Sequence, residues 1–121
     1  MNILLVEDNP TDAKLLTAVL QLGGHRVLGK RTAEQALEEI KSSHFPELIL
    51  LDLKLPGMGG LELARLLKAD PETEDIPIVA ITAELERFSR QESLDAGCDA
   101  YVSKPVDTRT LNAQIARAAA Q

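Results

Sequence analysis

The sequence predicts an α/β fold, a five-stranded parallel sheet with helices on both faces. Apolar runs typical of strands buried on both faces recur at 3–6, 48–51 and 77–81. Amphipathic segments with helical spacing separate these runs. Strands that alternate with helices imply right-handed βαβ units, and therefore a parallel sheet.

The first strand is expected at 2–6, and a helix follows it closely. Asn9 is a suitable N-cap for this helix, and Pro10 suits its first position. Gly23 and Gly24 end the helix. The next strand, at 26–30, has charged ends, which are typical of an edge strand.

The remaining elements follow from the same signals. A second amphipathic helix starts near Ala33 and ends before Pro46, and the apolar run that leads into Asp52 is the central strand. Asp70 to Asp75 is expected to be a solvated loop. The later strands and helices are expected at Gly60–Lys68 (helix), Pro77–Ile81 (strand, ending at Thr82), Leu85–Ala96 (helix, stopped by Gly97), Ala100–Val102 (strand) and from about Asp107 (helix).

Three strands are fully apolar and two are short or charged, so the second and fifth should lie at the edges. The order 2-1-3-4-5 satisfies this requirement and is the flavodoxin-like doubly wound (βα)5 arrangement. Ligands of such sheets bind at the carboxyl ends of the strands, at the switch point between the first and third. Glu7, Asp8 and Asp52 should meet there.

Composition limits the classes of function. The 121 residues, with 45% hydrophobic and 26% charged side chains, predict a single globular domain. The single cysteine, Cys98, excludes an internal disulfide and fits a reducing cytoplasm. The net charge of −6 and the lack of a Lys/Arg cluster argue against direct nucleic-acid binding, and no apolar run is long enough for a membrane span.

The polar residues at the predicted sheet edge suggest phosphoryl chemistry. Glu7, Asp8 and Asp52 would repel one another unless a cation joined them, and oxygen ligands suit Mg²⁺. Thr82 and Lys104 follow two further strands and should project from the same edge. A carboxylate nucleophile, a metal, a hydroxyl and an ammonium are the groups that phosphoryl transfer requires.

Four motifs carry a resemblance to a known family. They are Leu-Val-Glu-Asp-Asn at 5–9, Leu-Asp-Leu-Lys-Leu-Pro-Gly-Met-Gly-Gly at 51–60, Ile-Thr-Ala at 81–83 and Tyr-Val-Ser-Lys-Pro at 101–105. In this order and spacing, the sequence resembles the CheY-like receiver domains of two-component response regulators over essentially its full length. The resemblance implies a single-domain phosphorelay receiver without an output domain.

The resemblance also implies roles for individual residues. Asp52 would accept the phosphoryl group, and Mg²⁺, or Mn²⁺ in its place, would bind Asp8, Asp52 and the backbone carbonyl of Lys54, with Glu7 acting through water. Phosphate binding and switching would involve Thr82, Lys104 and Tyr101, and would change the face formed by the fourth helix, fifth strand and fifth helix. Pro105 would follow a cis peptide bond.

The resemblance further implies a cytoplasmic monomer or weak dimer that is not an enzyme on other substrates. It would catalyse only its own aspartyl phosphorylation and dephosphorylation. Its partners would be a histidine kinase or histidine phosphotransfer protein and a downstream protein target, without a membrane or nucleic acid. A receiver excised from a hybrid histidine kinase or larger regulator, and a pseudo-receiver that only binds partners, are the alternatives.

Each residue also has an ordinary structural explanation when taken alone. Thr82 could bond to backbone at a strand end, Lys104 could be solvated, and Tyr101 could be a surface aromatic. The combined pattern favours the functional interpretation, above all for Asp8, Asp52, Thr82 and Lys104. A haloacid-dehalogenase-type phosphatase needs an acidic residue where Lys54 stands. A flavodoxin-type cofactor binder needs a glycine-rich loop that is missing after the first strand.

Two departures from the family pattern lead to expectations of their own. Gly59 stands where an N-capping side chain is common, so the third helix should have a weaker start. Lys54 and Glu84 lie two residues beyond Asp52 and Thr82, at positions that tune phosphate lifetime in the family. We expect these opposite charges to pair across the mouth of the site and to hinder an attacking water.

Overall fold

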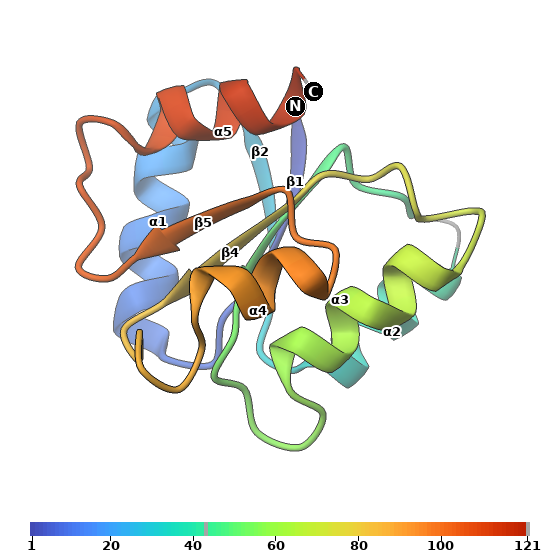
Figure 1. The fold of residues 1–121 in the computed structure, drawn as a ribbon. Coiled ribbons are helices and arrows are strands. Elements are labelled where there is room, and N and C mark those ends of the chain that lie inside the picture. The colour runs from blue at the N-terminus through green and yellow to red at the C-terminus, as the bar shows by residue number, and fades with distance from the viewer. Residues whose placement is uncertain (43, 121) are drawn as a thin grey trace.

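The computed structural model describes residues 1–42 and 44–120, and in it five strands alternate with five helices (Figure 1). Part of the expected end of the second helix, at Ser43, lies outside the described residues. The elements in chain order are β1 (Asn2–Val6), α1 (Pro10–Leu22), β2 (Arg26–Lys30), α2 (Ala33–Lys41), β3 (Leu48–Asp52), α3 (Gly60–Ala69), β4 (Ile78–Thr82), α4 (Arg90–Asp95), β5 (Ala100–Ser103) and α5 (Leu111–Ala119).

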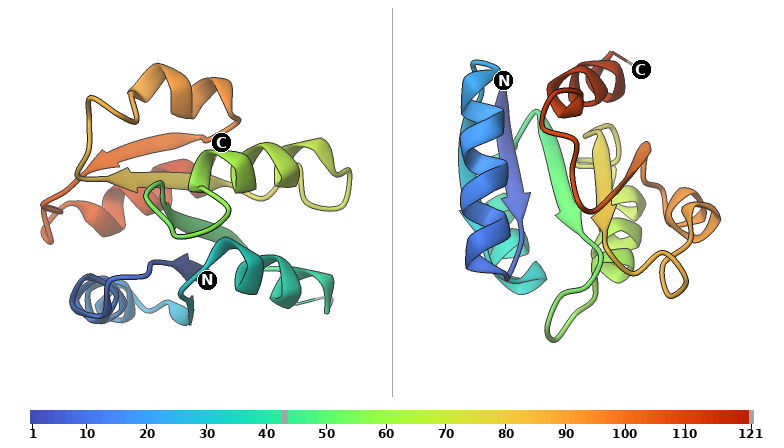
Figure 2. Two further views of the ribbon diagram at one scale, coloured as in Figure 1. Left: turned by 90° about the horizontal axis from the view of Figure 1, so that it is seen from below. Right: turned by 90° about the vertical axis from the view of Figure 1, so that its left-hand side faces the viewer.

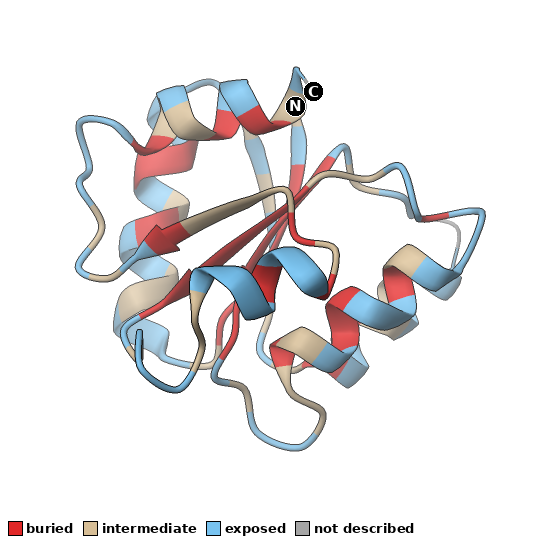
Figure 3. Cartoon of the chain, in the orientation of Figure 1, coloured by how far each residue is buried: buried red, intermediate tan, exposed pale blue. Residues whose placement is uncertain are grey.

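The sheet is parallel throughout and has the order β2-β1-β3-β4-β5, which confirms the predicted flavodoxin-like topology. Every residue of β3 and β4 is buried, whereas the edge strand β2 is largely exposed. This contrast follows from position, because a central strand of a doubly wound sheet is covered on both faces. Figure 3 shows the buried residues concentrated along the central strands.

Helices α1 and α5 cover one face of the sheet, and α2, α3 and α4 cover the other (Figures 1 and 2). Side chains alternate between these two layers along each strand. In β3, Leu48 and Leu50 face the core shared with α1 and α5, while Ile49 and Leu51 face the core shared with α2 and α3. The same alternation determines the face of the sheet toward which each side chain at a strand end points.

Helix α4 begins five residues later than the sequence predicts. Ser89 accepts a hydrogen bond from the Glu92 amide at 3.1 Å and donates to the Glu92 carboxylate at 3.2 Å. Ser89 therefore caps the helix, which sets the helix start at Arg90. The preceding residues form a turn closed by the Phe88 amide on the Glu84 carbonyl. The expectation of a helix from Leu85 was therefore wrong.

Helix α5 also begins late, at Leu111 rather than near Asp107. The Asp107 carboxylate accepts from the Arg109 backbone amide at 2.9 Å. An aspartate that bonds the following backbone competes with helix formation, so these residues form a turn. The expected solvated loop of 70–75 also needs correction, because Thr73 is buried and its hydroxyl donates to the Leu67 carbonyl at 2.6 Å.

The other differences are small. β4 begins at Ile78 rather than Pro77, α3 extends to Ala69 and β5 extends to Ser103. Gly59 is the N-cap of α3 and provides no side-chain cap, as expected. Within residues 1–42 and 44–120, no helix is long and apolar enough to cross a membrane.

Candidate functional site

The acidic residues of the candidate site come from the carboxyl ends of two adjacent strands. Glu7 and Asp8 follow β1, and Asp52 is the last residue of β3. Because β1 and β3 are paired in parallel, with Val6 opposite Leu51, these ends lie side by side. One carboxylate oxygen from each of Glu7, Asp8 and Asp52 lies within 4.8 Å of the others. The predicted convergence is therefore present.

Lys104 reaches into this cluster from the segment after β5. Its Nζ donates to Glu7 Oε1 at 2.6 Å, Asp12 Oδ2 at 2.9 Å and Asp52 Oδ2 at 3.1 Å. Burial alone would lower the pKa of this lysine, but hydrogen bonds to Glu7, Asp12 and Asp52 outweigh it and raise the pKa above its usual value. Lys104 is therefore a fixed positive charge inside the acidic cluster.

The pKa of Glu7 is strongly raised by its surroundings. Burial raises its pKa to about 7, and the nearby Asp52 carboxylate acts in the same direction, while the hydrogen bond from Lys104 opposes them. Its second oxygen accepts from the Asn9 amide at 3.2 Å. A raised glutamate pKa beside a second buried carboxylate indicates an excess of negative charge, which a bound divalent cation would neutralise.

Backbone contacts hold Asp52 in place. Its Oδ1 accepts from the Lys54 amide at 2.9 Å, and only 4% of the residue is exposed. Gly60, the first residue of α3, packs directly on the end of β3. A Cβ atom at Gly60 would lie 2.6 Å from the Asp52 carbonyl oxygen and 2.7 Å from Leu53 Cα. The loop after Asp52 can close onto the strand only because Gly60 has no side chain.

Thr82 and the two charged residues at the mouth lie beside the acidic cluster. Thr82 is buried at the end of β4, and its hydroxyl accepts from the Glu84 amide at 3.0 Å. Lys54 Nζ lies 3.3 Å from Glu84 Oε1, so the expected ion pair is present. Arg87 also approaches Glu84, at 3.5 Å. The pair joins the loops after β3 and β4.

Tyr101 in β5 is partly buried, and its hydroxyl donates to the Phe88 carbonyl at 2.5 Å. The guanidinium of Arg90 lies 5.2 Å from the centre of the Tyr101 ring. The aromatic ring therefore links β5 to the turn before α4. The Lys104–Pro105 peptide bond is cis, and the Lys104 amide donates to the Thr82 carbonyl at 2.8 Å.

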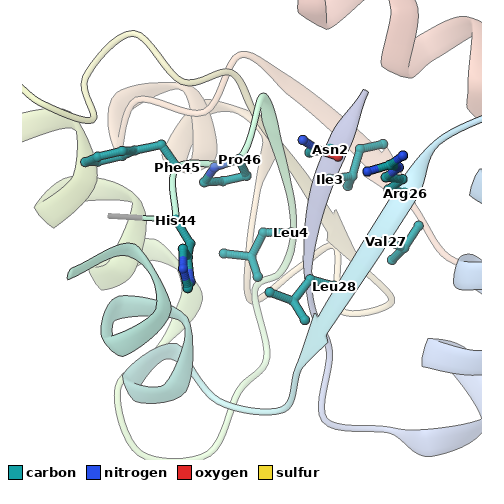
Figure 4. A pocket seen from close by; sticks show the side chains of 9 residues that line it. All are labelled: Asn2, Ile3, Leu4, Arg26, Val27, Leu28, His44, Phe45 and Pro46. Atoms are coloured by element: carbon teal, nitrogen blue, oxygen red, sulfur yellow. The ribbon is translucent and has the colours of Figure 1, made fainter. Parts of the chain in front are cut away.

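A groove of about 410 Å³ lies at the opposite end of the sheet (Figure 4). Leu4 and Leu28 from the sheet, and His44, Phe45 and Pro46 from the loop before β3, are among its lining residues. It lies near the start of β1, whereas Glu7 follows the end of that strand. The groove and the acidic cluster are thus separate features.

The donor set fits a hard divalent cation. Carboxylate oxygens suit Mg²⁺, which usually keeps several waters and is completed by phosphate oxygens. Asp8 is partly exposed and Asp52 is buried, so the cluster is accessible from one side. Sequence reasoning assigned Asp12, in the first turn of α1, no role at this site. Its carboxylate is instead an acceptor for Lys104.

A sequence profile described as the response regulator receiver domain matches residues 3–116. The chain belongs to this receiver family. The receiver is 35% identical over 105 residues to the polar-differentiation response regulator DivK of Brucella ovis, covering 87% of this chain and 85% of DivK. DivK proteins of Brucella suis and Brucella abortus match equally well.

Solved structures agree with this assignment. The receiver resembles a response regulator structure from Chloroflexus aurantiacus with a TM-score of 0.93 at 28% identity, over 99% of this chain and 98% of the other. It also resembles the receiver domain of a sensor histidine kinase from Pseudomonas aeruginosa, with a TM-score of 0.89 at 31% identity over 99% and 98% of the two chains. That structure has a magnesium ion coordinated in its active site cleft.

Proposed function

We propose that this receiver accepts a phosphoryl group on Asp52 from a histidine kinase or histidine phosphotransfer protein. The observation that carries the proposal is the convergence of Asp52 with Lys104 and two further carboxylates, Glu7 and Asp8, at one edge of the sheet. A buried carboxylate beside a fixed ammonium is equipped to become an acyl phosphate, because phosphoryl transfer depends mainly on positioning and charge neutralisation.

In the proposed reaction, a carboxylate oxygen of Asp52 attacks the phosphorus of a phosphohistidine. An O–P bond forms, the N–P bond breaks, and the imidazole leaves with its electron pair and takes up a proton. Lys104 pairs with one phosphoryl oxygen, and the Thr82 hydroxyl donates to another. In the present arrangement the hydroxyl accepts from the Glu84 amide and keeps its own proton for this donation.

Asp8, Asp52 and the Lys54 carbonyl would hold Mg²⁺, with Glu7 acting through water, and Mn²⁺ could substitute. When bound, the metal neutralises the charge on a phosphoryl oxygen. Binding only to the native state stabilises that state by mass action. Millimolar Mg²⁺ should therefore raise the melting temperature of the wild type but not of Asp8→Asn, and an equal shift in both would contradict the metal site.

The output surface would be the face of α4, β5 and α5. Tyr101 already joins β5 to the turn before α4 through the Phe88 carbonyl. A shift of Thr82 toward the phosphoryl group would alter the space behind this ring, and the face would then control a downstream protein partner. The domain would catalyse only its own phosphorylation and dephosphorylation.

Intact mass after incubation with Mg²⁺ and acetyl phosphate tests the acceptor. The wild type and the exposed-loop control Asp75→Asn should each gain the mass of one phosphoryl group, whereas Asp52→Asn should gain none. No adduct should form on the wild type when Mg²⁺ is left out of the incubation. The proposal is overturned if the wild type takes no phosphoryl group from acetyl phosphate or a phosphohistidine donor and binds no beryllofluoride. That outcome would leave a partner-binding pseudo-receiver.

The ion pair of Lys54 and Glu84 would hinder water from reaching the acyl phosphate. Both side chains reach solvent, with 64% and 35% exposure, so the pair is weak and salt-screened. Lys54→Ala and Glu84→Ala should each speed dephosphorylation by a modest factor, of about two to five. Unchanged rates in both variants would rule out this role.

A further inference from the structure

Asp12 gives Lys104 an acceptor outside the proposed metal ligands. Its Oδ2 lies 2.9 Å from Lys104 Nζ, slightly closer than the Asp52 oxygen at 3.1 Å. Of the three acceptors of Lys104, Asp12 is the most exposed, with 40% of its side chain reaching solvent. It is also not a member of the carboxylate group formed by Glu7, Asp8 and Asp52.

The capping of α1 leaves the Asp12 carboxylate available for this contact. Asn9 is the N-cap, and its side chain accepts from the amides of Thr11 and Asp12 at 3.0 Å. An acidic residue three positions after an N-cap commonly bonds back to the N-cap amide. Here that amide donates to Glu7 Oε2 instead. The Asp12 carboxylate therefore points to Lys104 rather than completing a capping box.

We propose that Asp12 is a positioning residue that holds the Lys104 ammonium at the α1 side of the site and competes with the phosphoryl group on Asp52 for it. The competition rests on the proposed function. A divalent cation would neutralise the charge of Glu7, Asp8 and Asp52, but it would leave Asp12 paired with Lys104. The phosphoryl group then shares its ammonium with a carboxylate and is repelled by that carboxylate. Asp12 thus shortens the life of the phosphorylated form.

Asp12→Asn keeps the shape of the side chain and removes its charge. At fixed Mg²⁺ it should bind beryllofluoride about three- to tenfold more tightly and lose its phosphoryl group more slowly by a similar factor. Asp12→Glu retains the charge and should remain near the wild type. Glu62→Gln, which removes an acidic residue from the first turn of α3, is the matched control and should leave both quantities unchanged.

Salt separates a charge effect from a structural one. Asp12 is partly exposed, so the difference between the wild type and Asp12→Asn should shrink at about 1 M salt, where charges are screened within about 3 Å. The inference is overturned if Asp12→Asn binds beryllofluoride no more tightly than the wild type, or if Asp12→Glu changes affinity as much as Asp12→Asn. A salt-independent difference would also overturn it.

A double-mutant cycle between Asp12→Asn and Lys104→Met, measured by urea unfolding in EDTA, does not depend on phosphorylation. Coupled residues should show a deviation from additivity of about threefold or more in the unfolding equilibrium constant. Additive effects would overturn the positioning role whatever the wild type does with phosphate. Coupling in a wild type that takes neither phosphate nor beryllofluoride would instead overturn the proposed function and the competition, and leave the positioning role standing.

Discussion

Two adjacent glycines at the start of α3 should respond differently to substitution by alanine: Gly60→Ala should destabilise the fold, and Gly59→Ala should change it little. A Cβ at Gly60 would lie 2.6 Å from the Asp52 carbonyl oxygen and 2.7 Å from Leu53 Cα, whereas a Cβ at Gly59 would meet nothing within 4 Å. Carbon atoms prefer separations of about 3.5–4.0 Å, so Gly60→Ala requires the strand end and the helix start to move apart by roughly 0.5–1 Å. Both crowding atoms belong to the backbone, so no side-chain rotation relieves the clash.

The magnitude follows from two opposing effects. Overpacking of this kind costs about 1–3 kcal/mol, and the better helix propensity of alanine returns at most about 1 kcal/mol. The free energy of unfolding of Gly60→Ala should therefore fall by roughly 1–2 kcal/mol, which corresponds to a drop of about 3–10 °C in melting temperature. Because the displaced backbone carries Asp52, the rate of adduct formation with acetyl phosphate should also fall, by about tenfold or more.

Urea unfolding of the wild type, Gly60→Ala and Gly59→Ala measures this directly. Gly59 has a φ of −74°, which alanine adopts readily, so Gly59→Ala should stay within about 0.5 kcal/mol of the wild type. If Gly60→Ala unfolds at the same urea concentration as Gly59→Ala and phosphorylates at the same rate, then the close packing of α3 on β3 does not position Asp52.

Three further predictions concern single side chains. The pKa of Glu7 is raised from 4.5 to about 7, so between these pH values the native state holds a proton that the unfolded state has lost. As pH rises from 4.5 to 7 in EDTA, the wild type should therefore lose about 2–3 kcal/mol of folding stability relative to Glu7→Gln. Parallel pH profiles of the two proteins would contradict this. Lys68 Nζ donates to two backbone carbonyls and to Asp99, so Lys68→Met should lower the free energy of unfolding by about 2–3 kcal/mol, against about 0.5 kcal/mol for the exposed control Lys14→Met. The buried Ser93 hydroxyl has no hydrogen-bond partner among the described residues, so Ser93→Ala should unfold at an equal or higher temperature, and a clear loss would indicate a partner.

The strand order could be predicted because the apolar runs alone distinguish central from edge strands. Glu7, Asp8 and Asp52 could be placed together for the same reason, since parallel strands deliver their carboxyl ends to one edge. The start of α4 was mispredicted although Ser89 and Glu92 carry a capping-box signal.

Other features depend on packing that local sequence does not specify. Asp12 meets Lys104 across 92 positions of chain, and the contact depends on how α1 lies against the segment after β5. Thr73 is buried, and its hydroxyl donates to the Leu67 carbonyl near the end of α3. The acidic residues around it in the sequence predict only a solvent-exposed loop. Gly60 resembles any helix-start glycine until the end of β3 is seen to pack against it.

The position of Lys104 offsets part of the charge of the buried acidic cluster. Glu7 and Asp52 are both nearly fully buried, and two such carboxylates would be costly without a compensating cation. Lys104 supplies that cation, but burial and the neighbouring Asp52 carboxylate still raise the pKa of Glu7. A divalent ion would neutralise the remaining negative charge of Glu7 and Asp52, but Lys104 would then be shared between Asp12 and an anion on Asp52. The same lysine therefore stabilises the buried carboxylates, and it becomes available to a phosphoryl group only to the extent that Asp12 releases it.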